Sequence, residues 1–316
     1  MTNNKYFRFD LQRFAKGDTL MDRADIAKAM YIGTKEVFMK TLKKNRAEEW
    51  KAACTVKTSK SMEETYETIG NLKPAAEKVE GDPVVYGDII EGNTVTLKNK
   101  TWANGYSVTM EAEEDEKWGI VNVGKTEELA RTMLQLRERN LAAVWDGVLV
   151  DVGGDGVAHA SHVHPLLNDA VLKNDNLIEA VFDATSYKNA CNLFNHWYNH
   201  EGEKFDTLPT QLLAHRDRQT DILALLQSQL VAFENSNTKN TIPQLKPTFN
   251  RYIAELPVHI IDENIDSVVL QRRKNLTTEY DYDKRSTFNF YFNVHERYIC
   301  GCINNGFGFV TIKGAA

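Results

Sequence analysis

Residues 125–148 limit the possible folds more than any other part of this 316-residue sequence. Thr126 followed by Glu127 and Glu128 supplies an N-cap and an acidic first turn, which together predict the start of a helix. Apolar side chains then recur at helical spacing along one broad face, at Leu129, Met133, Leu134, Leu136, Leu141, Ala143 and Val148. At about 1.5 Å per residue, such a helix is roughly 36 Å long and can span a whole domain.

Residues 62–116 have a different texture, with extended segments separated by turn signals such as Gly81-Asp82-Pro83. Apolar and polar residues alternate at Val95 and Leu97, and again from Tyr106 to Met110, as half-buried strands require. The segment contains few apolar residues for its length, and an isolated two-stranded ribbon is marginal in water. We therefore predict a long hairpin-like excursion that lies on a neighbouring surface.

The N-terminal residues 1–20 mix aromatic and charged side chains without a helical or strand period, which predicts an extended arm. Apolar groups on such a tail usually dock on another surface. A helix is expected over residues 22–49, with Asp22 as its cap and Gly33 in its middle. The candidate contacts with other subunits, from the arm and the excursion together, are Phe7, Phe9, Leu11, Phe14, Tyr86, Trp102 and Tyr106.

The second half of the chain mixes helices and strands. After a glycine-rich turn at residues 153–156, helices are expected at 185–200 and 216–234, with a short buried strand at 208–214 between them. Aromatic and β-branched residues close to the C-terminus predict long strands. The order of elements shows no regular βαβ alternation, so the expected fold class is α+β.

Composition excludes several classes of protein. The chain is 42% hydrophobic and 26% charged, which suits a folded protein for which two domains are the natural expectation. It has neither a run of about 20 apolar residues that could span a membrane nor a secretory signal, so no membrane partner is expected and the chain should stay in the cytoplasm where it is made.

The net charge of −6 and the pI of 5.8 have the wrong sign for a protein whose main task is to bind phosphates. The charge is uneven, because residues 1–48 contain eleven basic and six acidic side chains, a net charge of +5, and the remainder carries −11. A basic arm on an acidic body favours attraction between copies of the chain, although a solvated terminal segment with no role is the simpler alternative.

No catalytic, cofactor or metal site is predicted. His159, His162 and His164 cluster in an expected loop, and His196 and His200 are four apart on an expected helix, but that pair lacks the glutamate of a HExxH motif. Ordinary histidines are therefore favoured over a metal site. Nucleotide-binding and GxSxG patterns are also missing. The four cysteines lack CxxC spacing and are interpreted as reduced, mostly buried thiols, at Cys54, Cys191, Cys300 and Cys302.

Several strings, none of them catalytic, resemble those of major capsid proteins of tailed bacteriophages with the Hong Kong 97-type fold, particularly the Mu-like major head subunit family. Residues 9–15, FDLQRFA, resemble an N-terminal string common in capsid proteins of phages that infect low-GC Gram-positive hosts. Residues 102–109 with the acidic residues 113–115 are similar to the return strand of the family's extended loop. The order of the strings covers nearly the whole chain.

The segment that joins the long helix to the next domain also carries the resemblance. Asp155-Gly156, His164-Pro165 and Asn176-Leu177 are similar to the family's connection between its spine helix and its axial domain. The strand expected at 208–214 and the closing aromatic strands fit the axial domain and the return to the peripheral domain.

The resemblance implies four regions: an N-terminal arm and helix (1–50), an extended β-hairpin loop (51–118), a peripheral domain with the spine helix (119–165 plus 270–316) and an axial domain (166–269). It also implies a structural protein of the virion, which assembles in the host cytoplasm as homo-pentamers and homo-hexamers. The resulting icosahedral shell would enclose double-stranded DNA without reading its sequence. Expected partners are a portal, decoration proteins and a scaffolding protein encoded separately, because the arm begins almost at Met1. The alternatives are an encapsulin-like nanocompartment shell and, with less support, a metal-dependent enzyme.

Overall fold

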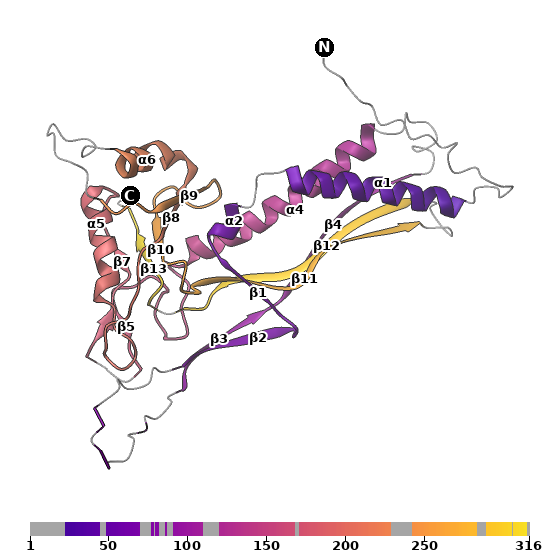
Figure 1. Cartoon of the computed structure of the whole chain (residues 1–316). Coiled ribbons are helices and arrows are strands. Elements are labelled where there is room, and N and C mark those ends of the chain that lie inside the picture. The colour runs from indigo at the N-terminus through magenta and orange to yellow at the C-terminus, as the bar shows by residue number, and fades with distance from the viewer. Residues whose placement is uncertain are drawn as a thin grey trace.

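The computed structural model describes residues 23–44, 49–69, 77–78, 80–81, 86, 91–109, 120–167, 171–228, 242–282, 289–304 and 306–314. Within them, two mixed sheets and a separate hairpin account for nearly all the strands (Figure 1). The predicted α+β class is confirmed. The expected arm, residues 1–20, lies outside the described residues.

The first sheet is long and is covered by helices on one side (Figure 1). Its outer strand β1 runs parallel to β11, whereas the other neighbours are antiparallel. Alternate residues of β12, from Phe292 to Tyr298, are buried against the helices because successive side chains of a strand point to opposite faces. In spatial order the strands are β1 (Thr55–Thr58), β11 (Val268–Tyr282), β12 (Phe290–Cys302) and β4 (Lys100–Val108).

The helices on this sheet are α1 (Arg23–Lys44) and the long α4 (Ile120–Gly147), and the four-residue α2 (Glu49–Ala52) lies beside α4. Helix α4 buries Leu129, Met133, Leu141 and Trp145, so the predicted amphipathic helix is confirmed. Its start was predicted too late. The helix begins five residues earlier, and Thr126 is fully buried inside it rather than capping it.

The second sheet has the spatial order β7-β13-β10-β8-β9 and forms a separate core with the shorter helices (Figure 1). Leu212, Val258 and Ile312 are fully buried between the sheet and these helices. Its strands are β7 (Leu177–Ile178), β8 (Gln211–His215), β9 (Lys246–Asn250), β10 (Val258–Ile261) and β13 (Phe309–Ile312). Its helices are α5 (Ala184–Leu193), α6 (Gln219–Gln227) and the 3-10 turns η2 (Phe194–His196) and η3 (Arg216–Arg218).

The hairpin consists of β2 (Glu63–Ile69) and β3 (Glu91–Lys98), which among the described strands pair only with each other. It leaves the first sheet on the side opposite to α1 and α4 (Figure 1). A small ribbon, β5 (His164–Pro165) with β6 (Lys173–Asn174), lies near the second sheet. No helix in the described part of the chain is both long enough and apolar enough to cross a membrane.

The pairing of strands differs from the expected division of the chain in two places. Strands β1 and β4, which fall in the predicted extended-loop region 51–118, both pair into the first sheet, so the free hairpin is shorter. Strand β13, which falls in the predicted segment 270–316 of the peripheral domain, pairs with β10 and β7 in the second sheet. Both differences arise from pairing between residues far apart in sequence, which local patterns do not report.

Candidate functional site

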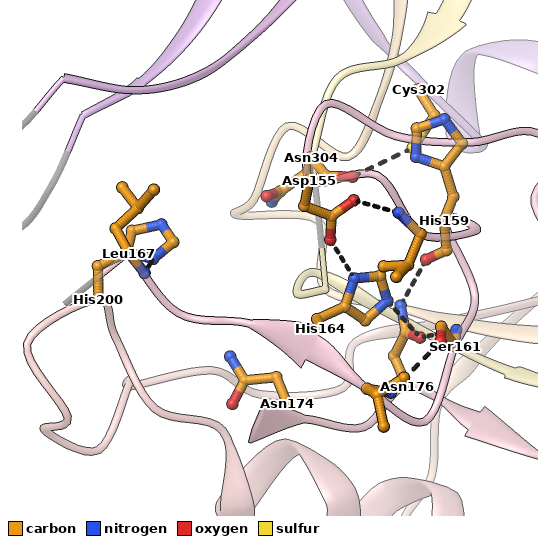
Figure 2. A network of polar contacts seen from close by, with 12 residues as sticks. Asp155, His159, Ser161, His164, Leu167, Asn174, Asn176, His200, Cys302 and Asn304 are labelled. Atoms are coloured by element: carbon orange, nitrogen blue, oxygen red, sulfur yellow. Dashed lines mark hydrogen bonds and ion pairs between the residues drawn. The ribbon is translucent and has the colours of Figure 1, made fainter. Parts of the chain in front are cut away.

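A buried network of polar contacts, which we call the junction, lies in the segment between α4 and β7 (Figure 2). At its centre, Nδ1 of His164 lies 2.6 Å from Oδ2 of Asp155, and both side chains are only 2% exposed. Nε2 of His164 lies 3.2 Å from Oδ1 of Asn176, which is fully buried. Both imidazole nitrogens are therefore engaged, and the ring links two segments of backbone.

Asn176 extends this junction to the neighbouring strands. Its Nδ2 donates to the carbonyl of His159 over 2.8 Å, and its Oδ1 accepts from the backbone N–H of Ser161 over 2.7 Å. The backbone carbonyl of Asn176 accepts from the N–H of Thr311 in β13. Burial lowers the pKa of His159, so the ring of His159 favours its neutral form. The junction thus joins the turn after α4 to the C-terminal strand.

A glycine allows the C-terminal segment to approach this junction. Gly306 has a φ of +84°, a left-handed conformation that side chains other than glycine rarely adopt. A Cβ at this position would lie 2.6 Å from Cβ of His164, so any other residue would also collide with the ring. The two ring nitrogens of His164 face Asp155 and Asn176, so among the described residues the ring bonds no serine hydroxyl or cysteine thiol. The geometry of the junction is that of a structural joint.

The other predicted histidine group is not arranged as a helical pair. Helix α5 ends at Leu193, His196 closes the following 3-10 turn, and His200 lies beyond it in a turn, so the prediction that both lie on one helix was wrong. His200 is buried and its ring contacts the ring of Phe307, with centroids 5.5 Å apart.

A third group of possible metal ligands was not singled out from the sequence. It consists of His215, Asp217 and Glu255, whose ligand atoms, one from each residue, lie within 4.8 Å of one another. The ring of His215 already uses Nδ1 to accept from the N–H of Asp217 and Nε2 to bond the carbonyl of Arg251. Neither ring nitrogen is therefore available for a metal in this arrangement.

The predicted subunit contacts fall into three groups. Phe7, Phe9, Leu11 and Phe14 lie outside the described residues. Tyr86 is 88% exposed and is available to another molecule. Trp102 and Tyr106, by contrast, point toward α4: the ring of Trp102 packs on Tyr298, and the hydroxyl of Tyr106 lies 2.8 Å from that of Thr126. The rings of Trp102 and Tyr106 thus have partners within their own chain.

Helix α1 presents a surface that sequence reasoning did not single out. Phe38 of this helix is fully buried against α4 and the first sheet, whereas Ile32 and Met39 are 59% and 44% exposed on another face. Lys40 and Lys43 are exposed as well. The seven-residue spacing of Ile32 and Met39 was the available signal, but it became informative only once the buried face of the helix was known.

A bidentate ion pair fixes α4 on the first sheet. Nε of Arg137 donates to both carboxylate oxygens of Glu296, at 3.0 and 2.9 Å, and the Glu296 side chain is 1% exposed. One turn further along α4, Nδ2 of Asn140 donates to the hydroxyl of Tyr298 over 2.8 Å. Helix and strand are therefore held in one register by polar contacts as well as by the apolar core.

Known proteins resemble this chain in sequence and in fold. Residues 27–179 match the family model described as the Mu-like prophage major head subunit gpT. A search of curated proteins gave no match. Among solved structures, the capsid of the cyanophage P-SCSP1u aligns with a TM-score of 0.55 at 8% identity, over 83% of this chain and 86% of that chain.

Two further structures show the same architecture. The procapsid of bacteriophage JBD30 aligns with a TM-score of 0.51 at 12% identity, over 94% of this chain and 77% of that chain. A virus-like particle from Pyrococcus furiosus aligns with a TM-score of 0.51 at 12% identity, over 88% of this chain and 96% of that chain. Identities this low establish the fold alone.

The chain therefore has the Hong Kong 97-type fold of phage capsid subunits. Taken with the match to the Mu-like head subunit model, this fold identifies it as a major capsid protein, the structural head subunit of a tailed bacteriophage.

Proposed function

We propose that this capsid protein assembles as pentamers and hexamers into a closed icosahedral shell around double-stranded DNA. The observation that supports this most directly is the β2–β3 hairpin. It pairs with no other strand in the described part of the chain and exposes Thr65, Glu67, Thr94 and Thr96 on its outer face. An isolated ribbon of this kind is marginal in water, so its surface is suited to a second copy of the chain. Capsomers in which each hairpin lies on a neighbour follow from this arrangement.

The charge of the chain supports DNA enclosure without sequence-specific binding. A net charge of −6 disfavours tight binding of phosphates, and a shell with little affinity for DNA does not impede its packing. The role is structural and involves no catalytic step. A portal, a separate scaffolding protein and decoration proteins are the proposed partners, and assembly takes place in the host cytoplasm.

Excision of the hairpin tests this function. The backbone N–H of Asn99 donates to the carbonyl of Met62 over 3.0 Å, so a two-glycine linker can replace residues 63–98 without displacing β4. We expect the excised chain to remain folded, because no buried residue of its hydrophobic cores lies in the excised segment, but to lose closed shells. The measurement is size-exclusion chromatography with negative-stain electron microscopy, and circular dichroism provides the control for folding.

The second variant removes residues 2–20, which should impair particle formation while the central fold stays intact. Normal shells from both variants would contradict the proposal.

The contents of purified wild-type shells separate the proposed role from an encapsulin-like one, because nucleic acid supports a phage head and a protein cargo supports a nanocompartment. A wild-type chain that stays monomeric or dimeric, even when produced with the proteins encoded beside it, would also contradict the proposal.

A further inference from the structure

The base of the β2–β3 hairpin is held to the first sheet by a compact group of hydrogen bonds. Strand β1 ends at Thr58, and the N–H of Ser59 still donates to the carbonyl of Arg272 in β11 over 2.8 Å. Ser59 is only 3% exposed. The chain therefore turns into the hairpin from a point that is fixed on the sheet.

Glu64 closes this turn from within the hairpin. One carboxylate oxygen, Oε1, accepts from the hydroxyl of Ser59 at 2.9 Å and from the backbone N–H groups of Lys60 and Ser61 at 3.0 and 3.1 Å. These three donors lower the pKa of Glu64, with the Ser59 hydroxyl as the largest cause. A charged acceptor makes stronger hydrogen bonds than a neutral one, and the three bonds to one oxygen fix the turn.

Asn99 ties the outgoing strand to the same point. It lies between β3 and β4, is 5% exposed, and donates through Nδ2 to the hydroxyl oxygen of Ser59 at 2.9 Å and to the carbonyl of Ser61 at 3.0 Å. Both strands of the hairpin are thus bound to one turn of three residues. We call this group of Ser59, Glu64 and Asn99 the elbow.

A second set of contacts fixes the direction of the hairpin above the elbow. Gln271 of β11 is fully buried, accepts from the hydroxyl of Tyr66 at 3.0 Å and donates to the carbonyl of Leu97 at 3.2 Å, so it bonds to both strands. The side chain of Leu97 fills the space left by Gly301 in β12, where a Cβ would lie 2.5 Å from Cδ2 of Leu97. The hairpin leaves the sheet at an angle determined by this close approach.

We propose that Glu64, Asn99 and Gly301 are positioning residues that fix the direction of the hairpin before it meets another copy, and that regular shells depend on this fixed direction. The second part rests on the proposed function, whereas the first concerns the single chain. A ribbon that already points toward its partner loses less conformational entropy on docking than one that moves freely about its base.

Hydrogen exchange on the unassembled full-length chain tests the elbow. Glu64→Ala should raise exchange at the amides of residues 59–62 and 99 by about tenfold or more, because the shared acceptor is lost. The matched control is Glu63→Ala, one residue earlier on β2, whose exposed side chain lies opposite Lys98. This control should leave exchange at the elbow unchanged. Equal exchange in the two variants would overturn the proposal.

A pair of compensating substitutions tests the contact between Gly301 and Leu97. Gly301→Val should displace Leu97 and raise exchange over residues 95–99, while the β11–β12 ladder stays protected because valine favours strands. Adding Leu97→Ala should restore protection, since it removes the colliding atoms. A double variant as perturbed as Gly301→Val alone would overturn the assigned role of this glycine.

Spin labels test the direction of the β2–β3 hairpin relative to the rest of the chain. Labels at Thr94→Cys on β3 and Lys188→Cys on α5 should give one narrow distance distribution by double electron–electron resonance. This distribution should broaden in Glu64→Ala and not in Glu63→Ala.

Under conditions in which the wild type forms closed shells, Glu64→Ala should yield irregular or fewer particles. A broadened distribution with normal shells would overturn the proposed dependence of assembly on the elbow. Failure of the wild type to form shells would instead contradict the proposed function, and the exchange result on the single chain would still stand.

Discussion

The two nitrogens of the buried His164 ring contact the side chains of Asp155 and Asn176, which lie in different segments of the chain. Replacement of His164 by alanine would leave the buried Asp155 carboxylate without this partner, and removing one member of a buried pair is costly. We expect His164→Ala to reduce the free energy of unfolding by about 3 kcal/mol, measured by urea denaturation. His162→Ala is the matched control, because that ring also lies 3.0 Å from an aspartate but is half exposed. The control should cost less than about 1 kcal/mol, and equal losses would contradict the structural role of the junction.

His259 makes stability depend on pH. It is fully buried in β10 beside Trp145, and burial lowers its pKa to about 3. The unfolded chain binds a proton at this ring below about pH 6.5, whereas the folded chain does not, so stability is greatest above pH 6.5 and falls as the pH decreases toward 3. Between these two pH values, His259 lowers the free energy of unfolding by about 1.4 kcal/mol for each pH unit of decrease.

His259→Gln should therefore make the unfolding free energy decline less steeply between pH 6.5 and 4.5. The change in slope should correspond to about one proton fewer bound on unfolding. Part of the decline should remain, because burial also lowers the pKa of His159 and His200. Urea titrations at a series of pH values provide the measurement. An unchanged slope in the variant would show that His259 is not kept neutral by burial.

At the same scale, sequence reasoning identified the residues of the junction but not their role. Asp155, His164 and Asn176 were singled out by resemblance, from three separate strings. Their contact depends on how the chain returns after α4 and on Gly306, which is more than 100 residues further along. Asn99 was not singled out at all, because a single asparagine between two strands carries no local signal of burial.

Among the secondary-structure elements, α4 depends on its polar attachment to β12. Arg137→Met would leave the Glu296 carboxylate buried without its partner, and we expect a loss of about 3–5 kcal/mol in unfolding free energy. The double variant Arg137→Met with Glu296→Leu should recover much of this loss, since an apolar pair of similar volume is often as stable as a buried ion pair. A double-mutant cycle measured by chemical denaturation tests this coupling.

The control for α4 is Arg131→Met, which removes an exposed ion pair with Glu127 four residues earlier on the same helix. Such pairs contribute about 0.3–0.5 kcal/mol, so this substitution should have a small effect. Similar losses from Arg131→Met and Arg137→Met would mean that burial does not decide the energy of the Arg137 pair.

The presence of helices and strands was easier to predict from sequence than the residues at which they begin and end or the strands that pair. Helical periodicity predicted α4, but the Thr126-Glu127-Glu128 pattern placed its start too far along the chain, because a buried threonine can look like a cap. Alternation predicted β3 and β4 without indicating that β4 joins β12 rather than continuing the hairpin. Ladders between distant strands depend on the packed structure and not on local propensity.

For the whole molecule, the unequal distribution of charge predicts how copies attract one another. Residues 1–48 carry +5 and the remainder −11, and Lys40 and Lys43 are exposed on α1 near the exposed Met39. Opposite charges on two copies raise the rate of encounter, and salt weakens this attraction because the screening length falls from about 10 Å at 0.1 M to about 3 Å at 1 M. Shell assembly followed by light scattering should therefore slow as salt increases.

Reversal of charge on α1 separates this local attraction from an effect of net charge. Lys40→Glu with Lys43→Glu should slow assembly at low salt and reduce its dependence on salt, because two positive charges that attract an acidic surface become negative. The matched control, Lys188→Glu with Lys204→Glu, makes the same change of charge at exposed positions around the second sheet. If both double variants slow assembly equally, overall repulsion controls the rate. A slower rate for the α1 variant alone assigns the attraction to the helix that exposes Ile32 and Met39.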